Sequence, residues 1–166
     1  MSDDLRYVRR IADYQFGVGV GRLLFPDGST IELSKGTGRP RRVYLDGVLL
    51  ATVRPDGLLA LTIHGAERLL KAVWGRRFRV YADERAVELV LDGRDLMCGY
   101  VADADEDLLP GDEALVVDRS GRLLAVGRAA VSGRTMKSLS EGVAVRIRGT
   151  KTKSEEMPSK DGGERG

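Results

Sequence analysis

The chain has 166 residues, which allows one ordinary domain or two small ones but not a large multi-step enzyme. Its net charge of +2 is too near zero to indicate a polyanionic partner, and a composition with 42% hydrophobic and 31% charged residues excludes global disorder. No apolar run approaches the roughly 18 residues of a membrane span. The amino terminus carries no apolar signal region, so the sequence predicts a cytoplasmic protein.

Residues 1–75 predict a small α/β lobe with an antiparallel sheet. Apolar residues recur at helical spacing from Leu5 to Ala12, which predicts an amphipathic helix over 5–14. Short strands separated by turns follow, and their ranges are 30–33, 41–45, 48–53 and 58–62, with Asp46-Gly47 as a hairpin turn. Between 65 and 73 apolar residues again recur every three or four positions, so we expect a helix that closes one face of the sheet.

Residues 76–150 predict a second lobe, dense in short strands and typical of a small β-barrel. A strand over 78–81 leads into a helix over 84–91, which Asp83 caps and Gly93 ends. Further strands are expected over 96–101, 114–117, 123–131 and 143–147, with a short helix over 134–139. Residues 151–166 lack apolar periodicity and predict a disordered tail. The predicted fold class is therefore α+β.

Rare residue types exclude several kinds of site. Cys98 is the only cysteine and His64 the only histidine, so one chain supplies neither a disulfide nor a structural zinc site. A hydrolase triad would need His64, which we interpret as structural, and Cys98 as a small buried hydrophobe. The glycine cluster over 17–21 lacks the strand, helix and downstream acid of a dinucleotide site, and the acids over 103–107 are interpreted as solvated surface. No cofactor, metal or catalytic centre is predicted.

Two compositional features bear on environment and charge. The chain has no Asn, one Gln, and 21 Arg against 6 Lys, which indicates either heat tolerance or a biased genome. The net charge is +3 over 1–75 and −1 over 76–150, so neither lobe binds a duplex by charge alone. In the second lobe the acids concentrate over 103–118 while most cations lie outside that block. This pattern predicts a basic face opposite an acidic loop.

Four motifs of the second lobe occur in a recognisable order: GRDLMCGYV (93–101), LPGDEALVVD (109–118), LAVGRA (124–129) and GVAVRIR (142–148). With them, the segment 79–148 resembles a PUA domain, the RNA-binding module named after pseudouridine synthases and archaeosine transglycosylases. The segment 12–70, with ADYQFG (12–17) and VYLDG (43–47), is similar to the domain that precedes PUA in archaeal tRNA-guanine transglycosylases. That family's catalytic barrel and zinc-binding cysteines have no counterpart here.

The resemblance implies an RNA-binding surface made by the glycine-bearing turn after the first helix and a neighbouring strand. Gly93 would bring backbone close to a sugar-phosphate, Arg94 would pair with a phosphate, and Met97 or Tyr100 would contact a base or ribose. The alternatives stay open that Gly93 only ends a helix and that Met97 fills the core. The cations that would complete the face are Arg79, Arg128, Lys137, Arg146 and Arg148, each of which is otherwise a solvated charge.

The first lobe adds a basic, glycine-containing loop over 35–42. Its cations are Lys35, Arg39, Arg41 and Arg42. Such a composition suits contact with a phosphate backbone, and the alternative is an ordinary mobile hairpin loop.

The sequence thus predicts a non-catalytic protein that binds structured RNA, with tRNA as the expected partner, in support of RNA modification. It would act alone or with a catalytic subunit. One alternative is a ribosome-associated PUA protein in translation initiation or recycling. Another is a magnesium-dependent nuclease or transferase that uses Asp103, Asp105 or Asp112.

Overall fold

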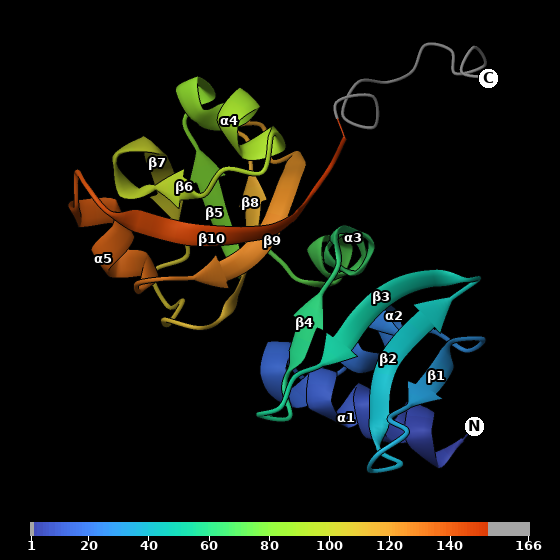
Figure 1. Cartoon of the computed structure of the whole chain (residues 1–166). Helices are drawn as coiled ribbons and strands as arrows, with labels where there is room; N and C mark the ends of the chain where they lie inside the picture. Colours follow the sequence, from blue (N-terminus) through green and yellow to red (C-terminus); the bar gives the residue numbers. More distant parts are fainter. Residues whose placement is uncertain (1, 153–166) are drawn as a thin grey trace, which may run out of the picture. The chain divides into compact units, whose positions relative to one another are not determined.

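The computed structural model describes residues 2–152, and contacts within the chain divide it into two units that meet between Gly75 and Arg76 (Figure 1). The first unit opens with helix α1 (Asp3–Phe16), where the Ser2 hydroxyl accepts a hydrogen bond from the Leu5 N–H at 3.1 Å. This N-cap starts the helix before the predicted residue 5. The buried side of α1 includes Val8, Ala12 and Phe16.

The glycine cluster over 17–21 introduces helix α2 (Val20–Leu24), which the sequence analysis did not predict. Gly21 lies against the backbone of Arg9 in α1, so closely that a β-carbon at this position would clash with the Arg9 carbonyl. The Gly21 N–H also donates to Asp13 Oδ1 at 2.7 Å. Gly21 therefore allows α1 and α2 to pack closely.

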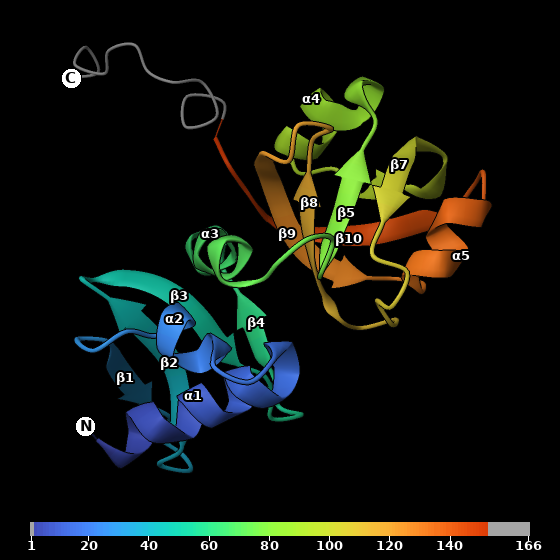
Figure 2. The ribbon, with the colours of Figure 1, turned by 180° about the vertical axis from the view of Figure 1, so that it is seen from behind.

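An antiparallel sheet follows in the order β1 (Thr30–Leu33), β2 (Pro40–Leu45), β3 (Val48–Val53) and β4 (Leu59–Leu61). Asp46 and Gly47 both have positive φ, at 53° and 80°, as the predicted tight hairpin requires. Helix α3 (Ile63–Ala72) is capped by Thr62 and lies against β3. Figure 2 shows α1 and α2 in front of the strands, so these helices cover one face of the sheet.

The second unit is built on a six-stranded sheet in the order β6-β10-β9-β8-β5-β7. Its strands are β5 (Arg79–Ala82), β6 (Leu96–Met97), β7 (Val101–Ala104), β8 (Glu113–Val117), β9 (Leu123–Ala129) and β10 (Val143–Thr150). β5 and β8 are parallel, and the other neighbours are antiparallel. The edge strands β6 and β7 are joined only by the 3-10 turn η2 (Cys98–Tyr100), so the sheet rolls into a nearly closed barrel.

Short helices complete the barrel. The 3-10 turn η1 (Glu84–Ala86) and helix α4 (Val87–Leu91) follow β5, and the Asp83 carboxylate caps η1 by accepting from the Arg85 N–H at 2.9 Å. Helix α5 (Gly133–Ser138) follows β9 and precedes β10 in the chain. Strand β10 runs across the front of the unit in Figure 1. The predicted α+β class, an antiparallel lobe followed by a small β-barrel with short helices, is confirmed.

Two expectations for the second unit were wrong. The strand predicted over 96–101 is interrupted at Cys98–Tyr100, because the 3-10 turn carries the chain from one edge of the sheet to the other. The acids expected in a solvated loop include Asp103 on β7 and the nearly buried Asp105, whose carboxylate accepts from the Phe78 N–H at 2.8 Å. Buried hydrogen-bond donors hold this carboxylate inside the fold.

Two expectations concern other parts of the chain. The tail predicted over 151–166 lies outside the described residues except for Lys151 and Thr152. Within residues 2–152, no helix combines the length and the apolar character needed to cross a bilayer.

Candidate nucleic-acid interface

A hollow of about 490 Å³, here named the turn hollow, opens beside the turn between α4 and β6. It contains four of the residues that the PUA resemblance implied. Its lining consists of Ala86, Leu89, Gly93, Arg94, Asp95, Met97, Tyr100 and Val143.

Gly93 shapes this turn through its backbone. Its φ is +93°, and the N–H groups of Gly93 and Arg94 donate to the carbonyls of Val90 and Leu89 at 2.9 and 3.0 Å. The residue therefore ends α4 in the left-handed conformation that glycine adopts without strain. Nothing lies within 4 Å of the position that a β-carbon would take, so the backbone also faces open space. Both interpretations of Gly93 are compatible with this geometry.

The floor of the turn hollow is apolar and partly exposed. Met97 is 39% exposed and Leu89 is 37% exposed, so the alternative that Met97 fills the core is wrong. Arg85 lies over the Tyr100 ring, 5.0 Å from its centroid. Hydrogen bonds from the Arg85 side chain and N–H lower the pKa of Asp83 to about 2, so the carboxylate that holds Arg85 stays charged. Among the described residues, the Arg94 guanidinium has no ion-pair partner.

A second hollow of about 360 Å³, here named the arginine hollow, lies on the outer face of β9 and β10. Arg128 and Arg146 are register partners on these strands, so their side chains stand on the same face of the sheet. Arg148, two residues further along β10, joins them. The complete lining is Gly111, Arg128, Ala129, Ala130, Arg146, Ile147 and Arg148.

The three arginines of this hollow differ in their partners. Arg148 pairs with both carboxylate oxygens of Glu113, with Nη1 3.3 Å from Oε2, and Glu113 is buried at 1% exposure. Arg128 donates through Nε to the Gly111 carbonyl at 3.3 Å. Both Arg128 and Arg146 are exposed. One arginine thus neutralises a buried carboxylate, while two others face solvent.

Asp95 connects the two hollows. Its carboxylate accepts from the Ile147 N–H at 2.9 Å and lies 3.7 Å from Arg146 Nη1. Asp95 lines the turn hollow, and Arg146 and Ile147 line the arginine hollow, so Asp95 links the linings of the two hollows. The sequence analysis missed Asp95; its position directly after Arg94 and before a strand was the available signal.

Lys137 and Arg79 lie outside both hollows. The Lys137 ammonium on α5 is 2.8 Å from Glu106 Oε2 and 3.1 Å from Asp103 Oδ1, and these carboxylates raise its pKa. Arg134 and Arg76 pair with the same two acids, at 3.4 and 2.6 Å. The expected separation of a basic face from an acidic loop therefore fails here, because these cations lie against the acids.

The side chain of Arg79 on β5 contacts the backbone of the residues just before it. Its Nη1 donates to the Arg77 carbonyl at 3.1 Å, and partial burial lowers its pKa.

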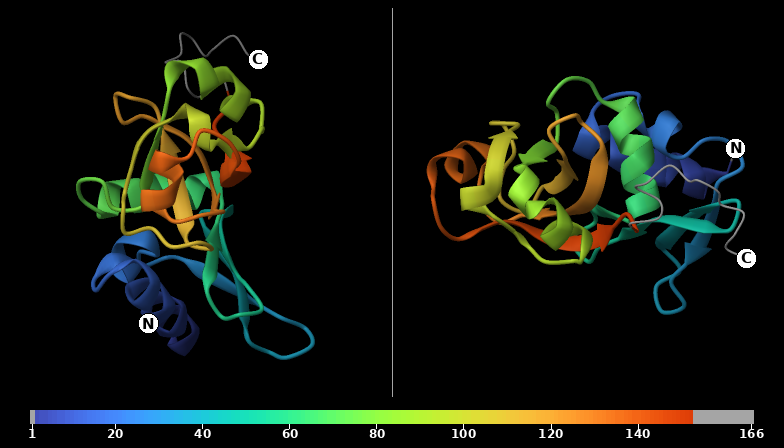
Figure 3. Two further views of the ribbon diagram at one scale, coloured as in Figure 1. Left: turned by 90° about the vertical axis from the view of Figure 1, so that its left-hand side faces the viewer. Right: turned by 90° about the horizontal axis from the view of Figure 1, so that it is seen from above.

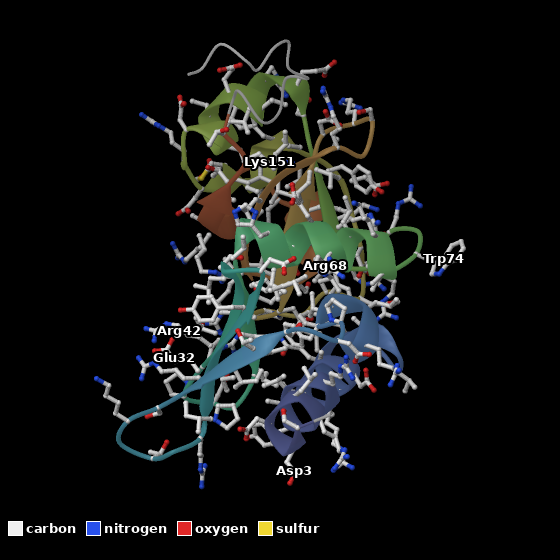
Figure 4. All side chains as sticks on the ribbon, turned by 90° about the vertical axis from the view of Figure 1, so that its right-hand side faces the viewer. Asp3, Glu32, Arg42, Arg68, Trp74 and Lys151 are labelled. Atoms are coloured by element: carbon white, nitrogen blue, oxygen red, sulfur yellow. The ribbon has the colours of Figure 1, made fainter. Side chains whose placement is uncertain are left out.

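The loop between β1 and β2 projects away from the helices of the first unit (Figure 3). Arg39 and Arg41 line a hollow of about 300 Å³ at its base, together with Tyr7 and Thr37. Lys35 is exposed. Arg42 lies beside Glu32, with Nη1 3.3 Å from Oε1, so its charge is partly neutralised (Figure 4).

The acids considered for metal chemistry are engaged in the fold. Asp103 pairs with Lys137 and Arg76, Asp105 holds the Phe78 N–H, and Asp112 accepts from the Leu109 N–H at 2.8 Å. Within the described part of the chain, no three His, Cys, Asp or Glu side chains form a group able to hold a metal ion. Cys98 is buried, and burial raises the pKa of its thiol.

Comparison with known families assigns both units. Residues 6–74 match the patch-forming domain C2 of tRNA-guanine transglycosylase, and residues 78–150 match the PUA domain. Residues 78–150 form a PUA domain. The turn hollow and the arginine hollow both lie within this PUA domain. The resemblance found in the sequence motifs is confirmed for both parts of the chain.

Curated relatives carry the same two parts within longer proteins. The tRNA-guanine(15) transglycosylase of Thermoplasma volcanium is 42% identical over 147 residues, 88% of this chain and 23% of that enzyme. The enzyme of the same name from Thermococcus onnurineus is 43% identical over 143 residues, 86% of this chain and 24% of that one. The chain therefore spans about a quarter of the length of the curated relatives it matches.

Solved structures share the fold. A hypothetical protein of Pyrococcus horikoshii matches with a TM-score of 0.69 and 27% identity over 94% of this chain and 96% of that chain. A conserved PUA domain protein from Thermoplasma acidophilum matches with a TM-score of 0.59 and 22% identity over 87% and 86% of the two chains. The second likeness concerns the fold alone.

Proposed function

We propose that this protein binds structured RNA, with tRNA as its partner, through the two hollows of its PUA domain. It performs no chemistry itself and supports tRNA modification in the cytoplasm by holding the RNA for a catalytic chain. The observation that carries this proposal is the junction of the two hollows at Asp95, which places an apolar floor beside exposed guanidinium groups. Ribose and base need the first environment, and phosphates need the second.

The turn hollow supplies contacts for a ribose or base. Met97, Leu89 and Tyr100 offer an apolar surface that a nucleoside can cover, and the open backbone at Gly93 leaves room for a sugar-phosphate to approach. Arg94 stands at the edge of this floor with no carboxylate to neutralise it among the described residues. Its guanidinium is therefore available to a phosphate.

The arginine hollow supplies contacts for phosphates. Arg128 and Arg146 project from adjacent strands, and a guanidinium can bind two phosphate oxygens at once. Arg148 is held by the buried Glu113, so we assign it a positioning role beneath the other two. The basic loop over 35–42 of the first unit would add sequence-independent phosphate contacts through Lys35, Arg39 and Arg41.

The relatives support tRNA as the partner. They are named tRNA-guanine(15) transglycosylases, and both units of this chain match them at about 40% identity. This chain spans about a quarter of their length, and RNA binding is the part of their activity that we assign to it.

Charge reversal tests the proposed function. We expect Arg94→Glu and Arg128→Glu each to weaken binding of a tRNA transcript by about tenfold or more, because a favourable phosphate contact becomes a repulsion. Arg10→Glu, at an exposed arginine of α1, makes the same change in net charge outside the proposed surface and should leave affinity within about twofold. A gel-shift titration measures all three variants. Unchanged affinity in both hollow variants, or binding to ribosomal subunits but not to free tRNA, contradicts the proposal.

A further inference from the structure

Trp74, the only tryptophan in the chain, is 86% exposed. Tryptophan has the largest apolar side chain and is highly buried on average, so an indole in solvent gives up stabilisation that burial would provide. Trp74 follows α3 directly, and Figure 4 shows its ring standing clear of the helix end. The indole therefore contributes little to the core of the first unit.

The residues before Trp74 are anchored, so the position of its backbone is defined. The Val73 N–H donates to the Leu69 carbonyl at 3.1 Å, and Val73 is itself buried. Arg68 ties α3 to α2 by donating from Nε and Nη2 to the carbonyls of Leu24 and Leu23, at 3.1 and 3.0 Å. The indole thus projects from a fixed helix end.

The surface formed by α2 and α3, ahead of Trp74 in the chain, carries two cations, one acid and a small apolar patch. A hollow of about 290 Å³ between α2 and α3 is lined by Leu23, Glu67, Arg68, Lys71 and Ala72. Lys71 is exposed and, within the described residues, has no ion-pair partner. Two of these lining residues are cations and one is an acid.

We infer that Trp74 is a stacking platform for an unpaired base of the bound RNA, with the cations of the α2–α3 hollow taking the adjoining phosphates. Every base has a flat face that can cover an indole, and the backbone on either side of a stacked base carries negative charge. The positive surroundings favour this occupant over an apolar protein surface, whose buried centre is depleted in charge. The inference rests on the proposed function and adds a contact in the C2 unit.

The experiment uses the full chain and two probes, a tRNA transcript and a blunt RNA duplex. Because Trp74 is the only indole, the intrinsic fluorescence of the protein reports on this residue. We expect the tRNA to quench and shift this emission and the duplex, which has no unpaired base, to leave it unchanged. Trp74→Ala should weaken tRNA binding by about tenfold and leave duplex binding unaltered, while Trp74→Phe, which keeps an aromatic face, stays within about threefold of wild type.

Tyr14→Ala is the matched control. Tyr14 is 84% exposed but lines none of the hollows described above, so its removal should not change tRNA affinity. Equal affinities of Trp74→Ala and wild type, or emission that does not respond to tRNA, overturn the inference. So does a concentration-dependent self-association in sedimentation that Trp74→Ala abolishes. The proposed function still holds after these results if tRNA binding depends on Arg94 and Arg128. If the wild-type protein does not bind tRNA, both the proposed function and this inference are contradicted.

Discussion

Two groups of cations in the PUA domain have similar composition and different electrostatic character. In the arginine hollow, Arg128 and Arg146 are exposed, and the ion pair of Arg146 with Asp95 is long, at 3.7 Å. At the contact of α5 with β7, Arg76, Arg134 and Lys137 are paired with Asp103 and Glu106. The difference shows that pairing in the fold, and not the number of basic residues, decides which cations remain available to a phosphate.

The largest expected effect concerns the buried ion pair beneath the arginine hollow. Arg148→Met removes the cation that neutralises the buried Glu113 and should lower the free energy of unfolding by about 3 kcal/mol, because a buried charge that has lost its ion-pair partner is costly. Urea denaturation measures this. Arg128→Met should change stability by less than about 0.5 kcal/mol.

A second variant distinguishes the loss of the ion pair from a change in side-chain packing. The double substitution Arg148→Met with Glu113→Leu removes both charges and should recover most of the lost stability. If the double variant is no more stable than Arg148→Met, the buried pair does not hold this part of the sheet.

The next effect separates the two groups by RNA affinity. Arg146→Gln should weaken tRNA binding about five- to tenfold, because it removes one exposed phosphate contact of the arginine hollow. Lys137→Gln makes the same change in charge at a cation that two carboxylates hold at 2.8 and 3.1 Å, whereas Arg146 has one carboxylate at 3.7 Å. Affinity of Lys137→Gln should therefore stay within about twofold. Fluorescence polarisation with a labelled tRNA compares the two variants directly. Equal losses would show that the paired cations also face the RNA.

The smallest effect is a pH dependence at the paired group. A hydrogen bond from Lys137 lowers the pKa of Glu106, and hydrogen bonds from the Ala104 N–H, Lys137 and Arg76 outweigh burial and lower the pKa of Asp103. Their contribution to stability is present above the ordinary values of 4.5 and 3.8 and is lost as pH falls through the lowered values.

Thermal melts therefore distinguish wild type from Lys137→Gln. Between about pH 5 and pH 3, the melting temperature of wild type should fall more steeply than that of the variant, which lacks the interaction that the acid removes. Arg128→Gln should show the wild-type slope. Parallel curves for wild type and Lys137→Gln would mean that these ion pairs add nothing to folding.

Much of the fold could be predicted from local patterns in the sequence. The strand Val48–Val53 agrees with its prediction, because its boundaries depend on alternation and on the adjacent Asp46-Gly47 turn. Helix α2 was missed because five residues that include a glycine carry no helical periodicity, and only packing against α1 defines them. The interruption at Cys98–Tyr100 was also missed, because it depends on closing the barrel.

The candidate site was predictable where it is local in sequence. Gly93, Arg94, Met97 and Tyr100 lie within eight positions, and the fold brings them to one hollow. The partners of Lys137 and Arg148 lie 31 and 35 residues away, so the sequence could not show that these charges are paired. Asp95, which joins the two hollows, was likewise hidden until β10 was placed beside it.

The salt dependence of tRNA binding tests the central claim most directly. We assume that Arg128 and Arg146 each contact a phosphate. The slope of log affinity against log salt concentration should then be less steep by about 2 in the double variant Arg128→Gln with Arg146→Gln than in wild type. The slope of Lys137→Gln should equal that of wild type. A double variant that keeps the full wild-type slope would contradict the account, because the arginine hollow would then hold no phosphate.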